Sequence, residues 1–139
     1  MLSSEQNTQM FVDAAIISAF ILPERRGRYL QLVQTKRGRI KFRKQLGHFR
    51  DFDTKFMKSI PAGQQTAKGI EILLRQQGAP SVCAIISESE ELDNIQMDLT
   101  AALSKIVGYG TGSVLSSLHG RLAYYESEEP GHRYILQKR

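Results

Sequence analysis

The spacing of the apolar residues changes along this chain, and that change constrains the fold more than any other feature of the sequence. In the first half, apolar residues recur at helical spacing. Between residues 8 and 21 they include Met10, Ala14, Ile17 and Ile21. After Gly112, apolar and polar residues alternate instead, which is typical of strands. The two patterns predict an α+β fold, with N-terminal helices packed on a C-terminal, mainly antiparallel sheet of three or four strands.

The expected elements follow from these patterns and from the residues that end them. We expect helices at 8–21, 64–77 and 98–107, and strands at 81–87, 113–118, 121–126 and 132–137. All helices are expected on one side of the sheet. A single domain is expected to span residues 1–139, with a helical half at about 1–60 and a helix–strand–helix–hairpin half at about 61–139.

Residues 25–53 fit two structures. As strands, they form a hairpin in which apolar and polar residues alternate around a turn at residues 35–38. As helices, they form a pair that is broken at Gly38, and Pro23 suits the first residue of the first helix. We favour the helix pair, because Phe42, Leu46 and Phe49 recur at helical spacing and cover more residues than the alternation does.

Charge is divided unevenly along the sequence. Residues 25–50 contain ten Lys or Arg and no Asp or Glu, whereas residues 76–104 contain five acidic residues and no Lys or Arg. The formal net charge of +5 is thus the sum of a basic half and an acidic segment. This asymmetry indicates either a polyanionic partner or contacts between complementary surfaces.

The basic segment is the candidate binding site, because Lys and Arg side chains neutralise phosphates and release bound counterions. If Phe42, Leu46 and Phe49 face inward, we expect the basic side chains to point outward. The candidate residues are Arg37, Arg39, Lys41, Arg43, Lys44 and Arg50. The alternative is that they pair with Glu88, Glu90 and Glu91 of the same chain or of a neighbour. The sequence leaves both possibilities open, and it contains no zinc-finger spacing or other nucleic-acid motif.

Signals for other chemistry are weak. His48, Asp51 and Asp53 are competent metal ligands, but their spacing matches no metal motif. Ser117 and His119 are expected on one face of a strand, and no third group is close in sequence to orient them. We therefore predict no catalytic residues, no metal site and no cofactor.

One cysteine excludes an internal disulfide, and Cys83 lies in an apolar run where we expect it to be buried and inert. The apolar stretch 10–22 is too short to span a membrane, and the first five residues lack the positive charge of a secretory signal. A cytoplasmic location is therefore expected.

The function expected from the sequence is that of a small intracellular binding module rather than an enzyme, with nucleic acid or another polyanion as its partner. The alternative is a protein-interaction or self-associating domain that uses complementary basic and acidic surfaces, for example with an acidic protein. A third possibility is an enzyme whose scattered catalytic residues leave no local motif. The sequence predicts no oligomeric state.

Overall fold

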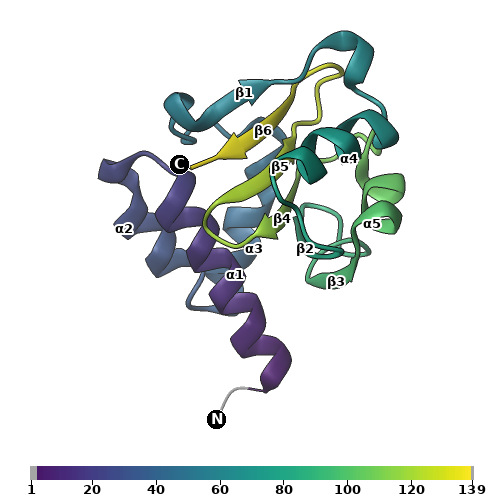
Figure 1. Ribbon diagram of the computed structural model, residues 1–139. Helices are drawn as coiled ribbons and strands as arrows, with labels where there is room; N and C mark the ends of the chain where they lie inside the picture. The colour runs from purple at the N-terminus through teal and green to yellow at the C-terminus, as the bar shows by residue number, and fades with distance from the viewer. Residues whose placement is uncertain (1–2, 139) are drawn as a thin grey trace.

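The computed structural model describes residues 3–138. The helices are α1 (Ser4–Phe20), α2 (Pro23–Leu32), α3 (Lys36–Lys44), α4 (Ala67–Gln76) and α5 (Leu99–Ile106). The strands are β1 (Met57–Ser59), β2 (Val82–Ser87), β3 (Ile95–Asp98), β4 (Ser113–Leu118), β5 (Leu122–Glu126) and β6 (Arg133–Gln137). Within residues 3–138, these six strands form one antiparallel sheet in the order β1-β6-β5-β4-β2-β3 (Figure 1).

The α+β class is confirmed, and the N-terminal helices do pack on the sheet. The predicted number of three or four strands is wrong, because β1 and β3 are additional strands. These two edge strands have three and four residues, which is too short for an alternating pattern to stand out in the sequence. Each is held by its neighbour instead, β1 by β6 and β3 by β2.

Helices cover both faces of the sheet. α1, α2 and α3 lie on one face, and α4 and α5 lie on the other (Figure 1). Successive side chains of β2 alternate accordingly: Ala84 and Ile86 pack with α1, whereas Cys83 and Ile85 pack with α4 and α5. The expectation that all helices lie on one side is therefore wrong. The central strands are apolar on both faces, and both faces must be covered.

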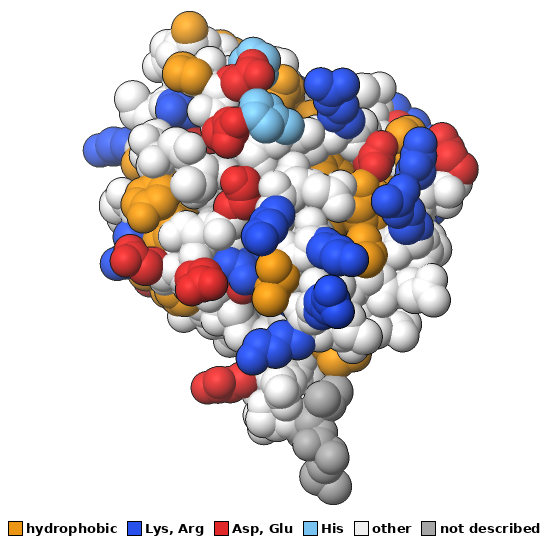
Figure 2. Space-filling model, turned by 180° about the vertical axis from the view of Figure 1, so that it is seen from behind, with side chains coloured by type: hydrophobic (Ala, Val, Ile, Leu, Met, Phe, Trp, Pro, Cys, Tyr) orange, Lys and Arg blue, Asp and Glu red, His pale blue; other side chains and the backbone are white. Residues whose placement is uncertain are grey.

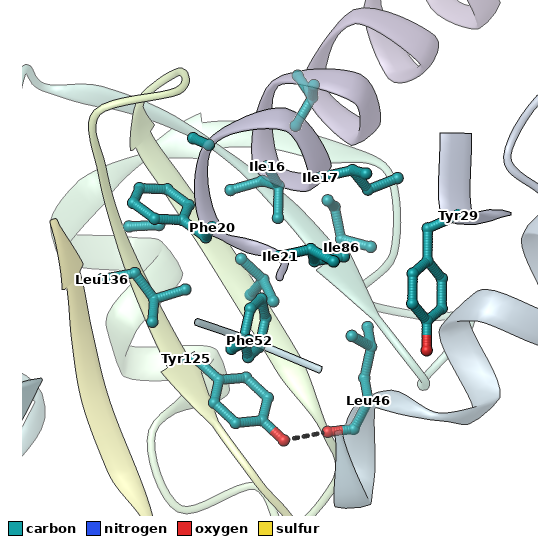
Figure 3. Close-up of a cluster of buried hydrophobic side chains, with 14 of the residues drawn as sticks. Ile16, Ile17, Phe20, Ile21, Tyr29, Leu46, Phe52, Ile86, Tyr125 and Leu136 are labelled. Carbon is teal, nitrogen blue, oxygen red and sulfur yellow. Dashed lines mark hydrogen bonds between the residues drawn. The ribbon is translucent and has the colours of Figure 1, made fainter. Parts of the chain in front are cut away.

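The core under α1 combines aliphatic side chains with aromatic rings from distant segments. Figure 3 shows Ile16, Ile17 and Phe20 of α1 above Ile86 and Tyr125 of the sheet. The hydroxyl of Tyr125 donates a hydrogen bond to the carbonyl oxygen of Leu46 at 2.5 Å, which ties the segment after α3 to the sheet. A buried tyrosine hydroxyl needs such a partner, so this bond holds the residues after α3 against the sheet.

The core under α4 and α5 is mainly aliphatic and contains Cys83, which is 2% exposed. Burial, with a smaller contribution from Asp98, raises the pKa of this thiol to about 12. The thiolate is therefore scarce near neutral pH, and the prediction that Cys83 is buried is confirmed.

The helix pair expected in the basic segment is confirmed, but the break between the helices is not at Gly38, and the second helix ends at Lys44, before Leu46 and Phe49. α2 ends at Leu32, and Gly38 lies in the first turn of α3. A β-carbon at Gly38 would lie 2.1 Å from the carbonyl oxygen of Leu32, so the close approach of the two helices requires glycine here. No helix in residues 3–138 is long and apolar enough to cross a membrane.

Candidate polyanion-binding surface

Two short helices position the basic segment. α2 begins with Pro23, and α3 begins after Thr35, whose hydroxyl accepts a hydrogen bond from the backbone N–H of Gly38. The rings of Tyr29 and Phe42 pack edge to face with their centroids 5.7 Å apart, which joins the two helices. Since these rings point inward, most of the basic side chains lie on the opposite, outer side.

Arg39 is an exception, because it lies between two carboxylates. Its side chain is 8% exposed. Its Nε donates to Asp13 at 2.7 Å, and its Nη1 donates to Asp93 at 2.5 Å. Burial by itself would lower the pKa of Arg39, but the hydrogen bonds to Asp93 and Asp13 outweigh it and raise the pKa above its ordinary value. Burial also raises the pKa of Asp13, although Arg39 opposes that shift.

Arg43 binds the acidic segment of its own chain. Its Nε donates to the carbonyl oxygen of Ser87 at 2.8 Å and lies 3.3 Å from a carboxylate oxygen of Asp93. The expectation that the basic side chains point outward is therefore wrong for Arg39 and Arg43. Both turn inward because Asp13 and Asp93 are carboxylates in a largely buried region, and such charges require cationic partners.

The remaining candidates are exposed. Arg37, Lys41 and Lys44 follow each other at helical spacing and form a row on α3, which we call the α3 stripe. We call the basic face this stripe together with four further exposed residues, namely Arg25 and Arg28 of α2, Lys36 of α3, and Arg50 in the segment after α3. Within residues 3–138, none of these seven side chains has an ion-pair partner. Figure 2 shows Lys and Arg side chains gathered over α3 and α2, with hydrophobic side chains between them.

The acidic segment is partly used within the chain. Asp93 holds Arg39 and Arg43, and Glu88 accepts a hydrogen bond from the backbone N–H of Gly47 at 3.2 Å. Burial raises the pKa of Glu88. Glu90 and Glu91 remain exposed. Two arginines of the basic segment, Arg39 and Arg43, thus pair within the chain, whereas the side chains of the basic face have no ion-pair partner in residues 3–138.

The three residues considered as metal ligands have separate partners. His48 pairs with Glu128, and Asp51 accepts a hydrogen bond from the hydroxyl of Tyr29 at 2.5 Å. Asp53 accepts one from the backbone N–H of Lys55 at 3.2 Å. Among the described residues, no group of three or more His, Cys, Asp and Glu side chains could hold a metal ion.

A serine–histidine pair occurs at the end of β4, but it involves Ser116 rather than Ser117. The Oγ of Ser116 lies 2.6 Å from the Nδ1 of His119. The expectation that Ser117 and His119 share a face is wrong, because the strand register shifts between Ser116 and Leu118. Ser116 is 0% exposed, and burial lowers the pKa of His119. A nucleophile must reach its substrate, so this pair serves to hold the strand end.

Sequence reasoning missed the two carboxylates that withdraw Arg39 and Arg43 from the surface. The sequence did contain one signal, because Asp13 interrupts an apolar helix and a buried carboxylate requires a cationic partner. Its partner could not be named, since Arg39 lies 26 residues away.

Comparisons with known proteins add no relative to this picture. A scan against protein-family models found no match, and searches of curated proteins and of solved structures found none either.

Proposed function

We propose that this chain binds a polyanion, and specifically nucleic acid, on the basic face of α2 and α3. The observation that carries the proposal is the absence of acidic partners for the seven exposed cationic side chains within residues 3–138. Phosphates can take the place of those partners, because Lys and Arg that neutralise phosphates release the counterions bound there. The geometry favours a contact with the backbone of the polymer, which is independent of base sequence.

Self-association through opposite charges is supported less well. Asp93 and Glu88 already have partners within the chain, so Glu90 and Glu91 are the exposed carboxylates left in this segment for a second copy. Exposed ion pairs contribute about 0–1 kcal/mol each, and two of them would not hold a dimer in salt. Light scattering at low and high salt distinguishes the two functions. Self-association through opposite charges predicts a dimer or larger species at low salt, whereas we expect a monomer at both salt concentrations.

Removing the α3 stripe tests the proposal. The triple variant Arg37→Ala/Lys41→Ala/Lys44→Ala should bind mixed-sequence RNA or DNA more weakly than the unchanged protein. The logarithm of its binding constant should also depend less on the logarithm of salt concentration, with a slope that is smaller by about 2–3, since each lost phosphate contact removes about 0.7–0.9. Fluorescence anisotropy across a salt series measures both quantities.

A matched control removes the same charge from elsewhere. The variant Lys58→Ala/Lys68→Ala/Lys105→Ala changes three exposed lysines outside α2 and α3. It should keep most of the affinity and most of the salt slope. Equal losses in the two triple variants would mean that only net charge matters and would refute the basic face as the site. Failure of the unchanged protein to retard any nucleic acid at low salt would refute the function.

A further inference from the structure

A groove beside the basic face lies between α1 and α3 and has a volume of about 410 Å³. α1 lines it with Gln9 and Met10, and α3 lines it with Lys36 and Ile40. Lys36 and Ile40 are one helical turn apart, in the row next to the α3 stripe. A polymer whose phosphates follow the stripe therefore passes along the rim of this groove.

Charge is compensated inside the groove, unlike on the stripe. Arg39 and Arg43 contribute to its lining, but Asp13 and Asp93 together already neutralise them. Glu90 adds a further carboxylate to the lining. A phosphate gains little in such surroundings and gains more on the stripe, which has no acidic partner in the described chain. The groove is thus suited to an uncharged group that is attached to a charged backbone.

A nucleobase has an apolar ring face and a hydrogen-bonding edge, and the walls of the groove offer a contact to each. Ile40 is 39% exposed and, with Met10, offers an apolar surface for the face of a ring. The side-chain amides of Gln9 and Gln34 line the groove and have no hydrogen-bond partner among the described residues. An amide can donate to and accept from a base edge, and the carboxylate of Glu90 can accept from an amino group of a base.

We propose that this groove takes up an unpaired base of a single-stranded nucleic acid whose phosphates lie on the α3 stripe. The inference rests on the proposed function, which it narrows from nucleic acid in general to single strands. In a duplex the bases are stacked and paired, so a base must first be extruded from the duplex before it can enter the groove between α1 and α3. Unpaired bases of a single strand are free to do so.

The test compares three probes on one neutral variant. The probes are a mixed-sequence single-stranded oligonucleotide, its duplex, and inorganic polyphosphate of similar charge. The variant Gln9→Ala/Ile40→Ala removes groove contacts and leaves the net charge unchanged. We expect the unchanged protein to bind the single strand several-fold more tightly than the duplex. We expect the variant to lose about tenfold in affinity for the single strand and nothing for polyphosphate, since the loss of one apolar contact and one hydrogen bond has an effect of this size.

The control variant Ile72→Ala/Gln76→Ala makes the same substitutions on α4, where Ile72 is 48% exposed. It should bind all three probes as the unchanged protein does, and urea unfolding should show that both variants fold. Equal affinity for single strand and duplex, or an unaltered single-strand affinity in Gln9→Ala/Ile40→Ala, would overturn the inference while leaving the proposed function in place. Failure to bind both the single strand and the duplex at low salt would instead refute the proposed function, even if polyphosphate binds.

Discussion

The two sides of α3 carry the same kind of side chain in different surroundings. On the inner side, Arg39 and Arg43 are nearly buried and held by Asp13 and Asp93. On the outer side, Arg37, Lys41 and Lys44 are exposed and have no ion-pair partner in residues 3–138. The inner residues therefore contribute to the fold, and the outer ones are available to a partner. A count of basic residues does not separate these two roles. Substitutions on the inner side should lower the free energy of unfolding, whereas substitutions on the outer side should weaken binding.

The largest expected effect comes from Arg39→Met. This change leaves the carboxylates of Asp13 and Asp93 without their shared partner in a nearly buried site, which typically costs about 3–5 kcal/mol. The free energy of unfolding at neutral pH, measured with urea, should fall by this amount. Arg37→Met, on the outer side of the same helix, is the control and should change it by less than about 0.5 kcal/mol. Similar values for the two variants would contradict the division into inner and outer sides.

The loss in Arg39→Met should also depend on pH. Burial already raises the pKa of Asp13 above its ordinary value of 3.8 in the folded protein. The folded state therefore binds the proton of the Asp13 carboxyl group more tightly than the unfolded state does. The contribution of Asp13 to stability is thus greatest at low pH and falls as pH rises from about 4 through the raised pKa. Removing Arg39 raises that pKa further. The deficit of the variant should therefore be smallest near pH 4 and grow toward pH 7.

A smaller effect is expected from Asp93→Asn. The carboxylate of Asp93 accepts hydrogen bonds from Arg39 and from the backbone of Ser87, and it lies 3.3 Å from Arg43. Replacing it with an amide weakens these charged contacts, so the free energy of unfolding should fall by about 1–3 kcal/mol. Hydrogen exchange should become faster in residues 87–93. Glu91→Gln, in the same segment, is the control and should change neither the free energy of unfolding nor the exchange rate. If hydrogen exchange in residues 87–93 is unchanged in Asp93→Asn, other contacts hold this segment.

The smallest effect on stability, and the clearest on binding, is expected from Arg37→Ala. Since Arg37 is exposed and unpaired within the described chain, its loss should change the free energy of unfolding by less than about 0.5 kcal/mol. The slope of the logarithm of nucleic-acid affinity against the logarithm of salt concentration should fall by about 1, because one phosphate contact is lost. Lys68→Ala on α4 is the control. An unchanged slope would exclude Arg37 from the contact surface.

The sequence predicted the elements whose periodicity extends over enough residues. The apolar stripe of α1, the helix expected at 98–107, which is α5, and the strands β5 and β6 were all visible in it. β1 and β3 were not, since pairing with β6 and β2 holds them rather than a pattern of their own. The continuous apolar run of β2 did indicate burial on both faces, which should have placed helices on both sides of the sheet.

The candidate site was predictable only as a segment. Helical spacing separates Arg37 from Arg39, but it does not show which of them faces a carboxylate. That depends on Asp93, which lies 54 residues from Arg39 and reaches it through the loop that joins β2 to β3. The sequence shows that the segment carries ten positive charges, but tertiary contacts determine which of these side chains remain on the surface.

β6 has a consequence for how this protein is made. It pairs with β5 on one side and with β1 on the other, and its Leu136 belongs to the core under α1. On the ribosome, α1 and β1 emerge long before β6 is synthesised. During that interval β1 cannot pair at the edge of the sheet and the core under α1 remains incomplete, because both need β6. We therefore expect the nascent chain to expose apolar α1 to chaperones until β6 has left the exit tunnel.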